Sequence, residues 1–258
     1  MGDAGGGDGV RVPRIFVSPD AWDNDRVTIT GLDYHHIRHV LRLGPGARLI
    51  VLDGDGRSFE AVIETVQKGS LSALVTGEAP ALPEPPVKVT LVQGLPRGEK
   101  MELIVRKATE IGVAGIVPLA AARAVPRLAG DRAGRRRTRW QRIAVEAAEQ
   151  SGRGRFPLVA EIQDLAGVLR GLPDGAAAFL LWEAEQATTL KQVLRAGPAR
   201  AEVYLFIGPE GGFTRDEVAA ARDAGVVPVS LGGRILRTET AGLVAAALVL
   251  YEWADLGG

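Results

Sequence analysis

The chain has 258 residues, and its 31 lysines and arginines balance 31 aspartates and glutamates, so the formal net charge is zero. Charged residues make up 24% of the sequence and hydrophobic residues 46%, which excludes a disordered chain and predicts one or two folded domains. Cysteine is absent, which excludes disulfides, zinc ribbons, iron–sulfur clusters and thiol nucleophiles.

The first ten residues are rich in glycine and are expected to form a disordered N-terminal extension. They lack the basic start and apolar run of a signal peptide. The most apolar stretch, residues 240–251, is too short to cross a bilayer and predicts a buried core helix. We therefore expect a cytoplasmic protein.

Residues 11–78 are predicted to form a small, barrel-like β domain. Short β-branched runs predict strands at 14–17, 26–30, 48–52 and 59–64. Glycines at 54 and 56 suit a hairpin turn between the last two strands. A short helix is expected over 33–43, because Gly44-Pro45-Gly46 ends it.

A proline-rich linker is predicted at residues 79–87, where four prolines favour extended backbone. From residue 88 to 258, apolar strands alternate with helices, which predicts a parallel sheet covered on both faces. The expected strands are 87–93, 115–119, 176–182, 203–207 and 226–231. The expected helices include 99–111 and 139–150.

The first candidate site is the glycine-rich turn Gly208-Pro-Glu-Gly-Gly212, which follows a buried strand. Ligands of open α/β sheets bind beyond the carboxyl ends of strands, and glycines expose backbone to a ligand. Thr214 and Glu217 form a capping box for the next helix. A tight turn without a ligand is the alternative. The missing Gly-Lys-Ser/Thr and G-x-G-x-x-G patterns argue against a phosphate loop and a Rossmann site.

The second candidate site is the next strand-end loop, which carries polar residues before the apolar helix. They are Arg234, Arg237, Thr238, Glu239 and Thr240. Alternatively, Thr238 or Thr240 caps the helix while Glu239 complements its dipole. Two such loops so close in sequence predict one shared ligand pocket.

Charge is segregated between residues 123 and 155, where ten arginines stand against three acidic residues, a local net charge of +7. Arginine binds phosphates bidentately and stacks on bases, so this run predicts a polyanionic partner such as a nucleic acid. A solvated charged face is the alternative. No metal site is expected, because the three histidines, 35, 36 and 39, lack a further ligand.

Six motifs in the right order resemble the bacterial ribosomal RNA small subunit methyltransferase E family. They are Arg14–Phe16, the helix His35–Arg42, Lys100–Gly112, Glu146–Arg153, Gly208–Gly212 and Leu231–Ala241. A glycine-rich extension and an arginine-dense insert around residues 135–137 depart from the family pattern.

The resemblance implies a fold, an activity and partners. The fold is a PUA-like RNA-binding β domain (11–78), followed by a SPOUT-type α/β methyltransferase domain (88–258) with a C-terminal trefoil knot. The activity is methylation of N3 of a uridine in 16S ribosomal RNA of the small subunit, with S-adenosyl-L-methionine as cofactor. A homodimer is also implied. The implied cofactor residues are Leu181, Trp182, Glu183, Gly208, Pro209, Glu210, Gly211, Gly212, Leu231, Gly232, Ile235, Leu236, Arg237, Thr238 and Thr240.

For this chemistry, a guanidinium is expected to stabilise negative charge on the uracil, with Arg237 as the first candidate and Arg153 as the second. Glu239 either accepts the N3 proton or plays a structural role. Phosphate contacts are expected from Arg14, His36, Arg38 and Arg42 in the small domain, and from Arg123, Arg139, Arg142 and Arg153 in the large one. The alternatives are a non-catalytic RNA-binding ribosome-assembly factor with the same fold, and an enzyme that uses a different nucleotide.

Overall fold

The computed structural model describes residues 12–124 and 130–254 of the chain. Its contacts divide the chain into two units. The N-terminal unit ends at Pro83 and also includes residues 152–155, and the C-terminal unit contains the rest of the chain from Glu84 onward. Residues 1–10, which were predicted to be disordered, lie outside the described residues. So does Arg127, one of the ten arginines between residues 123 and 155. Among the residues that are described, no helix combines the length and the apolar character needed to cross a membrane.

The N-terminal unit is built on one sheet, whose described strands follow the order β1-β4-β5-β6-β3-β2. All neighbours are antiparallel except β1 and β4, which are parallel. Alternate residues of β3, Val27 and Ile29, point into the core while their neighbours are exposed, as period-two patterning requires. The strands are β1 (Arg14–Phe16), β2 (Trp22–Asp23), β3 (Arg26–Thr30), β4 (Arg48–Leu52), β5 (Ser58–Gln67) and β6 (Ser70–Ala79).

Three features of this unit differ from the sequence prediction. Strand β6 was not predicted, although Leu71 and Ala73 are buried with the alternation of a strand, and β5 extends beyond the expected 59–64 into mostly exposed residues. The expected helix 33–43 is instead a short α1 (Gly31–His35) that continues as one π-helical turn, η2 (His36–Val40). A wide turn of this kind has no distinctive sequence spacing.

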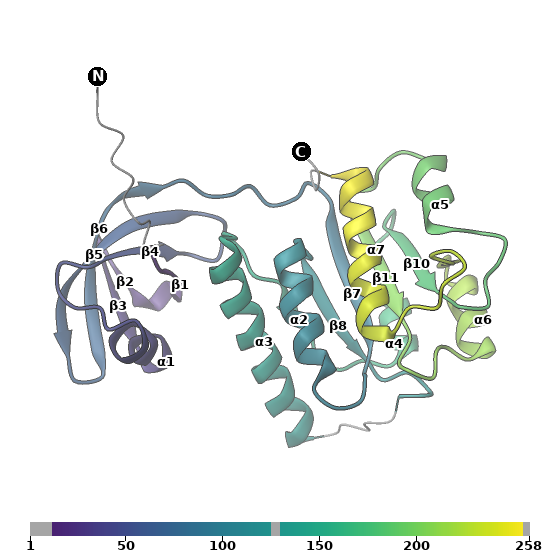
Figure 1. The fold of residues 1–258 in the computed structure, drawn as a ribbon, viewed down its shortest axis with the longest axis horizontal. Helices are drawn as coiled ribbons and strands as arrows, with labels where there is room; N and C mark the ends of the chain where they lie inside the picture. The colour runs from purple at the N-terminus through teal and green to yellow at the C-terminus, as the bar shows by residue number, and fades with distance from the viewer. Residues whose placement is uncertain (1–11, 125–129, 255–258) are drawn as a thin grey trace. The chain divides into compact units, whose positions relative to one another are not determined.

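The C-terminal unit contains the predicted parallel sheet, in the order β12-β10-β11-β7-β8-β9. Strands β7, β8, β10 and β11 can be followed in Figure 1. Every pair of neighbouring strands in the described sheet is parallel. Its strands are β7 (Lys88–Gly94), β8 (Gly115–Leu119), β9 (Leu158–Val159), β10 (Ala177–Leu181), β11 (Glu202–Ile207) and β12 (Val227–Val229). Its helices are α2 (Lys100–Ile111), α3 (Asp131–Ser151), α4 (Leu165–Arg170), α5 (Leu190–Ala196), α6 (Arg215–Asp223) and α7 (Thr238–Trp253).

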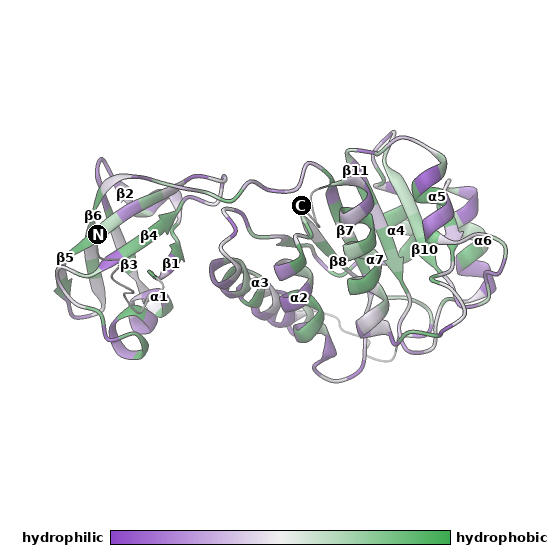
Figure 2. Cartoon of the chain, turned by 45° about the horizontal axis from the view of Figure 1, so that its top comes forward, coloured by the Kyte–Doolittle hydropathy of each residue, from purple (hydrophilic) through white to green (hydrophobic). Residues whose placement is uncertain are grey.

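Helices cover both faces of this sheet, as the uninterrupted apolar strands predict. In β7, Leu91 packs into a core that it shares with α2, α3, α5 and α7, whereas the next residue, Val92, packs with α4 and α6 on the opposite face. Figure 2 shows the hydrophobic colouring of β10 and β11 between these layers, and hydrophilic colouring on α5.

The predicted elements of the C-terminal unit need three corrections. Helix α3 begins at Asp131 rather than 139, so the arginine-dense insert at 135–137 is helical. Helix α7 is only partly buried: Leu248 is 43% and Tyr251 64% exposed, because the helix packs one side on the sheet. The short elements β9 and α4 were not predicted. The trefoil knot stays a prediction.

The packing of α7 on the sheet predicts opposite effects of two glycine-to-alanine substitutions. A Cβ at Gly242 would lie 2.9 Å from Leu91 Cδ1 and 3.2 Å from Ile207 Cγ1, so Gly242→Ala should lower the free energy of unfolding by about 1–3 kcal/mol. Gly134 in α3 has open space around it, so Gly134→Ala should raise stability by about 0.5–1 kcal/mol. Urea unfolding measures both, and equal stabilisation would contradict the packing described here.

Candidate functional site

Three strand-end loops meet around one cavity of about 940 Å³ in the C-terminal unit. Strand β10 pairs with both β11 and β12, so the carboxyl ends of these parallel strands lie side by side. The loops that line the cavity contain residues 181–186, 208–212 and 229–239. A cavity of this size suits a small organic ligand. The predicted convergence of the glycine-rich loops is therefore present in the structure.

Every predicted cofactor residue except Thr240 lines this cavity. Thr240 is exposed, and its backbone N–H bonds to the carbonyl of Arg237 within the first turn of α7. Sequence reasoning did not assign further lining residues to the cofactor, because no local pattern shows that their side chains face the cavity. They are Lys100, Glu185, Gln186, Thr189, Ile207, Val229, Ser230, Gly233 and Ala241.

The Gly208–Gly212 turn is packed through its backbone. A Cβ at Gly94, the last residue of β7, would lie 2.5 Å from the backbone nitrogen of Pro209. A Cβ at Gly212 would lie 2.7 Å from Glu183 Oε1, and this residue also has a positive φ of 64°. These contacts fix the main chain of the turn, and all of residues 208–212 line the cavity. The capping box of Thr214 and Glu217 is confirmed, and it fixes the start of α6.

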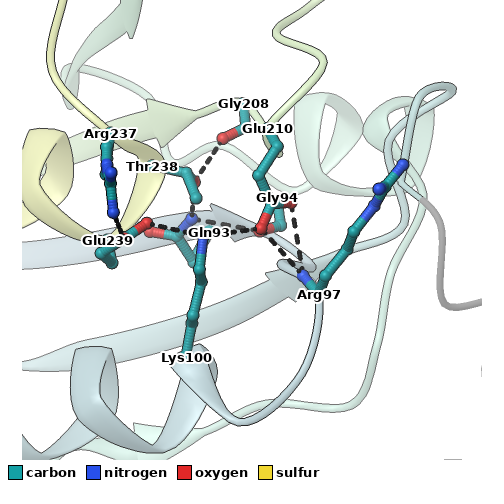
Figure 3. A network of polar contacts seen from close by, with 9 residues as sticks. All are labelled: Gln93, Gly94, Arg97, Lys100, Gly208, Glu210, Arg237, Thr238 and Glu239. Atoms are coloured by element: carbon teal, nitrogen blue, oxygen red, sulfur yellow. Dashed lines mark hydrogen bonds and ion pairs between the residues drawn. The ribbon is translucent and has the colours of Figure 1, made fainter.

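A largely buried chain of hydrogen bonds joins two of the cavity loops (Figure 3). Gln93 Nε2 donates to Thr238 Oγ1 at 2.9 Å, and Thr238 Oγ1 donates to the carbonyl oxygen of Gly208 at 2.6 Å. Gln93 is fully buried, and its Oε1 accepts no hydrogen bond within the described chain. Thr238 therefore does not cap α7, whose N-cap residue is Arg237 without a side-chain cap bond.

The two predicted catalytic residues near the cavity differ in exposure. The Arg237 side chain is 84% exposed, and its Nη1 lies 3.9 Å from Glu239 Oε1. The Glu239 side chain is only 14% exposed. Burial by itself raises the pKa of Glu239, but its own backbone N–H and the ammonium of Lys100 outweigh burial, so the pKa lies below its usual value. Glu239 is consequently ionised and weakly basic.

Arg153, the second catalytic candidate, is not among the residues that line the cavity. It is 8% exposed, and its contacts group it with the N-terminal unit. Within the described residues, no group of three or more histidine, cysteine, aspartate or glutamate side chains could hold a metal ion.

Several predicted RNA-binding arginines of the C-terminal unit already have partners in the chain. Arg139 Nε forms an ion pair of 2.9 Å with Glu102, and Arg142 Nε forms one of 2.8 Å with Glu146. Arg123 Nη1 donates to the carbonyl oxygen of Gly211 at 2.8 Å, so this arginine supports the glycine-rich turn.

The remaining candidates lie in the N-terminal unit. His36, Arg38 and Arg42 are exposed on and just after the π-helical turn, and Arg14 is half-buried in β1. Arg38 Nη1 donates to the carbonyl oxygen of Leu43 at 3.4 Å.

Two family models match the chain: an RNA methyltransferase domain over residues 83–250 and an RNA methyltransferase PUA domain over residues 29–76. The fold is thus that of an RNA methyltransferase. The chain is 34% identical to ribosomal RNA small subunit methyltransferase E of Bacillus subtilis, over 90% of this chain and 92% of that protein. It is 36% identical to the protein of the same name from Mycobacterium tuberculosis, over 92% and 91%.

Solved structures agree with these relatives. Ribosomal RNA small subunit methyltransferase E from Neisseria gonorrhoeae, bound to S-adenosyl methionine, has a TM-score of 0.85 and 30% identity, covering 95% of this chain and 99% of that one. The putative methyltransferase Lpg2936 from Legionella pneumophila, in complex with the cofactor SAM, has a TM-score of 0.83 and 29% identity, covering 96% and 100%. The chain belongs to the ribosomal RNA small subunit methyltransferase E family. The predicted resemblance and fold class are confirmed, apart from the knot.

The buried hydrogen-bond chain predicts a large cost for an isosteric change at Thr238. Thr238→Val leaves the carbonyl of Gly208 without this donor, so the free energy of unfolding should fall by about 1–3 kcal/mol. Thr138→Val is the matched control, because Thr138 is exposed on α3 and bonds only within its own helix, to Gly134. It should change stability by no more than about 0.5 kcal/mol. If Thr238→Val and Thr138→Val lose the same free energy of unfolding in urea, Thr238 does not support the Gly208–Gly212 turn.

Proposed function

We propose that this chain transfers the methyl group of S-adenosyl-L-methionine to N3 of a uridine in 16S ribosomal RNA of the small subunit. The observation that carries the proposal is the meeting of three strand-end loops around one cavity, in a chain of the ribosomal RNA small subunit methyltransferase E family. The cavity is bounded by backbone of a glycine-rich turn, without a phosphate-binding lysine motif.

The residues that line the cavity fit this cofactor. Backbone groups of Gly208–Gly212 and of Leu231–Leu236 are available to hold an adenosyl group, and Leu181 and Ile207 supply apolar wall. Similar structures from Neisseria gonorrhoeae and Legionella pneumophila contain the cofactor. When bound, S-adenosylmethionine supplies a methyl group that its sulfonium makes electrophilic, so the chain needs no covalent nucleophile. Positioning of the substrate is then the main task of the protein.

Arg237 is the residue that we assign to the uracil. Loss of the N3 proton spreads negative charge onto the uracil carbonyl oxygens, and a guanidinium stabilises such charge. Its side chain lines the cavity, is largely exposed, and within residues 12–124 and 130–254 has only a long ionic contact, of 3.9 Å, with Glu239. This leaves its donors available to the substrate.

Glu239 is assigned an orienting role rather than that of a base. Its lowered pKa, which results from its own backbone N–H and from Lys100 in spite of burial, makes the carboxylate a poor proton acceptor. It instead holds a negative charge beside Arg237 and Lys100. The N3 proton then leaves to water at the exposed edge of the cavity.

The N-terminal unit is proposed to bind the RNA, which is supported by its PUA domain match and by the exposed His36, Arg38 and Arg42. Sequence-selective RNA binding reads unstacked bases, so the target uridine is expected to be single-stranded or extruded. We also infer a homodimer in the cytoplasm. The pairing is supported by exposed apolar side chains on α7, namely Leu248 and Tyr251.

Loss of the protein should remove one methyl group from 16S ribosomal RNA. Mass spectrometry of RNA from cells that lack the chain should show one unmodified uridine, and the purified chain should restore the modification when S-adenosylmethionine is added. Calorimetry should also show that the chain binds this cofactor. A chain that binds ribosomal RNA but neither binds the cofactor nor restores the methyl group is a non-catalytic assembly factor, and the proposal is then wrong.

Removal of the Arg237 guanidinium should affect turnover more than cofactor binding. Arg237→Met is expected to lower kcat by about 100-fold, the usual effect of losing one donor to a developing anion. Arg237→Lys should recover part of this loss, because it keeps the charge but not the planar donors. Single-turnover methylation assays measure the rate, and calorimetry measures the affinity for S-adenosylmethionine. An unchanged rate in Arg237→Met would exclude this residue from the reaction.

A further inference from the structure

Lys100 lines the cavity although it belongs to none of the three strand-end loops. It is the first residue of α2, and its ammonium reaches two of those loops at once (Figure 3). Lys100 Nζ lies 3.0 Å from Glu210 Oε1 in the glycine-rich turn and 3.2 Å from Glu239 Oε2 in the first turn of α7. One side chain therefore bridges two of the loops that line the cavity, the glycine-rich turn and the loop that leads into α7.

Glu210 has a second anchor in the same segment. The backbone N–H of Arg97, in the connection between β7 and α2, lies 3.1 Å from Oε1 and 3.3 Å from Oε2 of Glu210. The carboxylate thus ties the glycine-rich turn to the residues that lead into α2. Because β7 lies beside β11 in the sheet, this connection has a fixed position from which Lys100 can reach across.

The charges of this group are mutually supporting. Hydrogen bonds to Glu210 and then Glu239 raise the pKa of Lys100. Burial by itself raises the pKa of Glu210, but the hydrogen bond from Lys100 and the backbone N–H groups of Glu210 and Arg97 together outweigh burial, so the pKa is lowered. The pKa of Glu239 is also lowered. All three groups are therefore ionised at neutral pH, so the bridge is a permanent feature rather than a switch.

The bridge is too exposed to contribute much to folding. The Lys100 side chain is 36% exposed and that of Glu210 31%, and ion pairs at such positions add little to global stability. Their positions nevertheless matter locally, because each carboxylate belongs to a loop whose backbone bounds the cavity. A shift of either loop by a fraction of an ångström changes the shape that a ligand must fit.

We propose that Lys100 is a positioning residue that sets the spacing between the Gly208–Gly212 turn and the start of α7, and through it the affinity for the cofactor. This inference rests on the proposed function, because the cofactor is S-adenosylmethionine. Lys100 acts through Glu210 and Glu239, and its removal should weaken cofactor binding more than it slows the chemical step, which depends on Arg237.

Substitutions of Lys100 test the proposal on the full chain. Lys100→Met should raise the Kd and the KM for S-adenosylmethionine about tenfold, with kcat within about twofold of the unchanged chain. Lys100→Arg should restore most of the affinity, because it keeps a cation within reach of both carboxylates. Lys107→Met is the matched control: Lys107 is on the same helix and pairs with Glu110 at 2.8 Å, but it does not line the cavity. It should leave Kd, KM and kcat unchanged.

A double-mutant cycle separates positioning from direct contact with the cofactor. If Lys100 acts through Glu210, then Glu210→Gln alone should weaken binding, and Lys100→Met combined with Glu210→Gln should cost clearly less than the two separate losses added together. Additive losses would mean that Lys100 contacts the cofactor itself, and an unchanged Kd in Lys100→Met would mean that it has no role. Either outcome overturns the proposal.

The controls distinguish this inference from the proposed function. If the unchanged chain neither binds S-adenosylmethionine nor methylates ribosomal RNA, the proposed function is wrong and this inference is wrong with it. If the unchanged chain does both and Lys100→Met matches it, only the inference is wrong. Should Lys100→Met fail to fold, the milder pair Lys100→Arg and Glu210→Gln decides. Wild-type affinity in Glu210→Gln then overturns the proposal.

Discussion

The absence of room around the Gly208–Gly212 turn is the constraint on which the site depends. Gly94 approaches Pro209 so closely that any side chain at Gly94 would strike backbone. Gly208 likewise faces the main chain of Gly212, because a Cβ on Gly208 would lie only 3.0 Å from the Cα of Gly212. Backbone cannot move aside as a flexible side chain can. The turn is therefore held by main-chain packing, and main-chain atoms bound the cavity. Polar bridges from Thr238 and Lys100 then set how the next loop lies against it.

Local sequence patterns were sufficient to predict the parallel sheet and the two glycine-rich loops, because both depend on short apolar runs and on glycines at strand ends. The supports of the loops were not predictable in this way. Gln93 and Thr238 are 145 residues apart, and they meet only because β7 lies beside β11 and under the start of α7. Lys100 begins one of the six sequence motifs, but no local pattern indicates that its side chain reaches two loops far along the chain.

The arginine run shows a different limit of sequence reasoning. A net charge counted over residues 123–155 ignores acidic residues elsewhere in the chain. In the structure, Glu102 on α2 pairs with Arg139, and Glu161 lies 3.0 Å from Arg137. Arg137 Nε also donates to the carbonyl oxygen of Val159, which fastens α3 to β9. Part of the run therefore serves packing of the C-terminal unit, and its sequence charge overstates the positive potential available to RNA.

The two bridges between the cavity loops differ in how they depend on solvent. Thr238 itself is buried and its hydrogen bonds are buried or part-buried, so salt has little access to them, and their loss leaves desolvated polar groups without compensation. The ion pairs of Lys100 lie at a partly exposed edge, where salt at physiological concentration screens charges over about 8 Å. The buried bridge thus makes the loop arrangement possible, and the exposed one adjusts it. The hydrogen bonds of Thr238 thus maintain the fold of the site, while the spacing of its loops stays sensitive to one cation, the ammonium of Lys100.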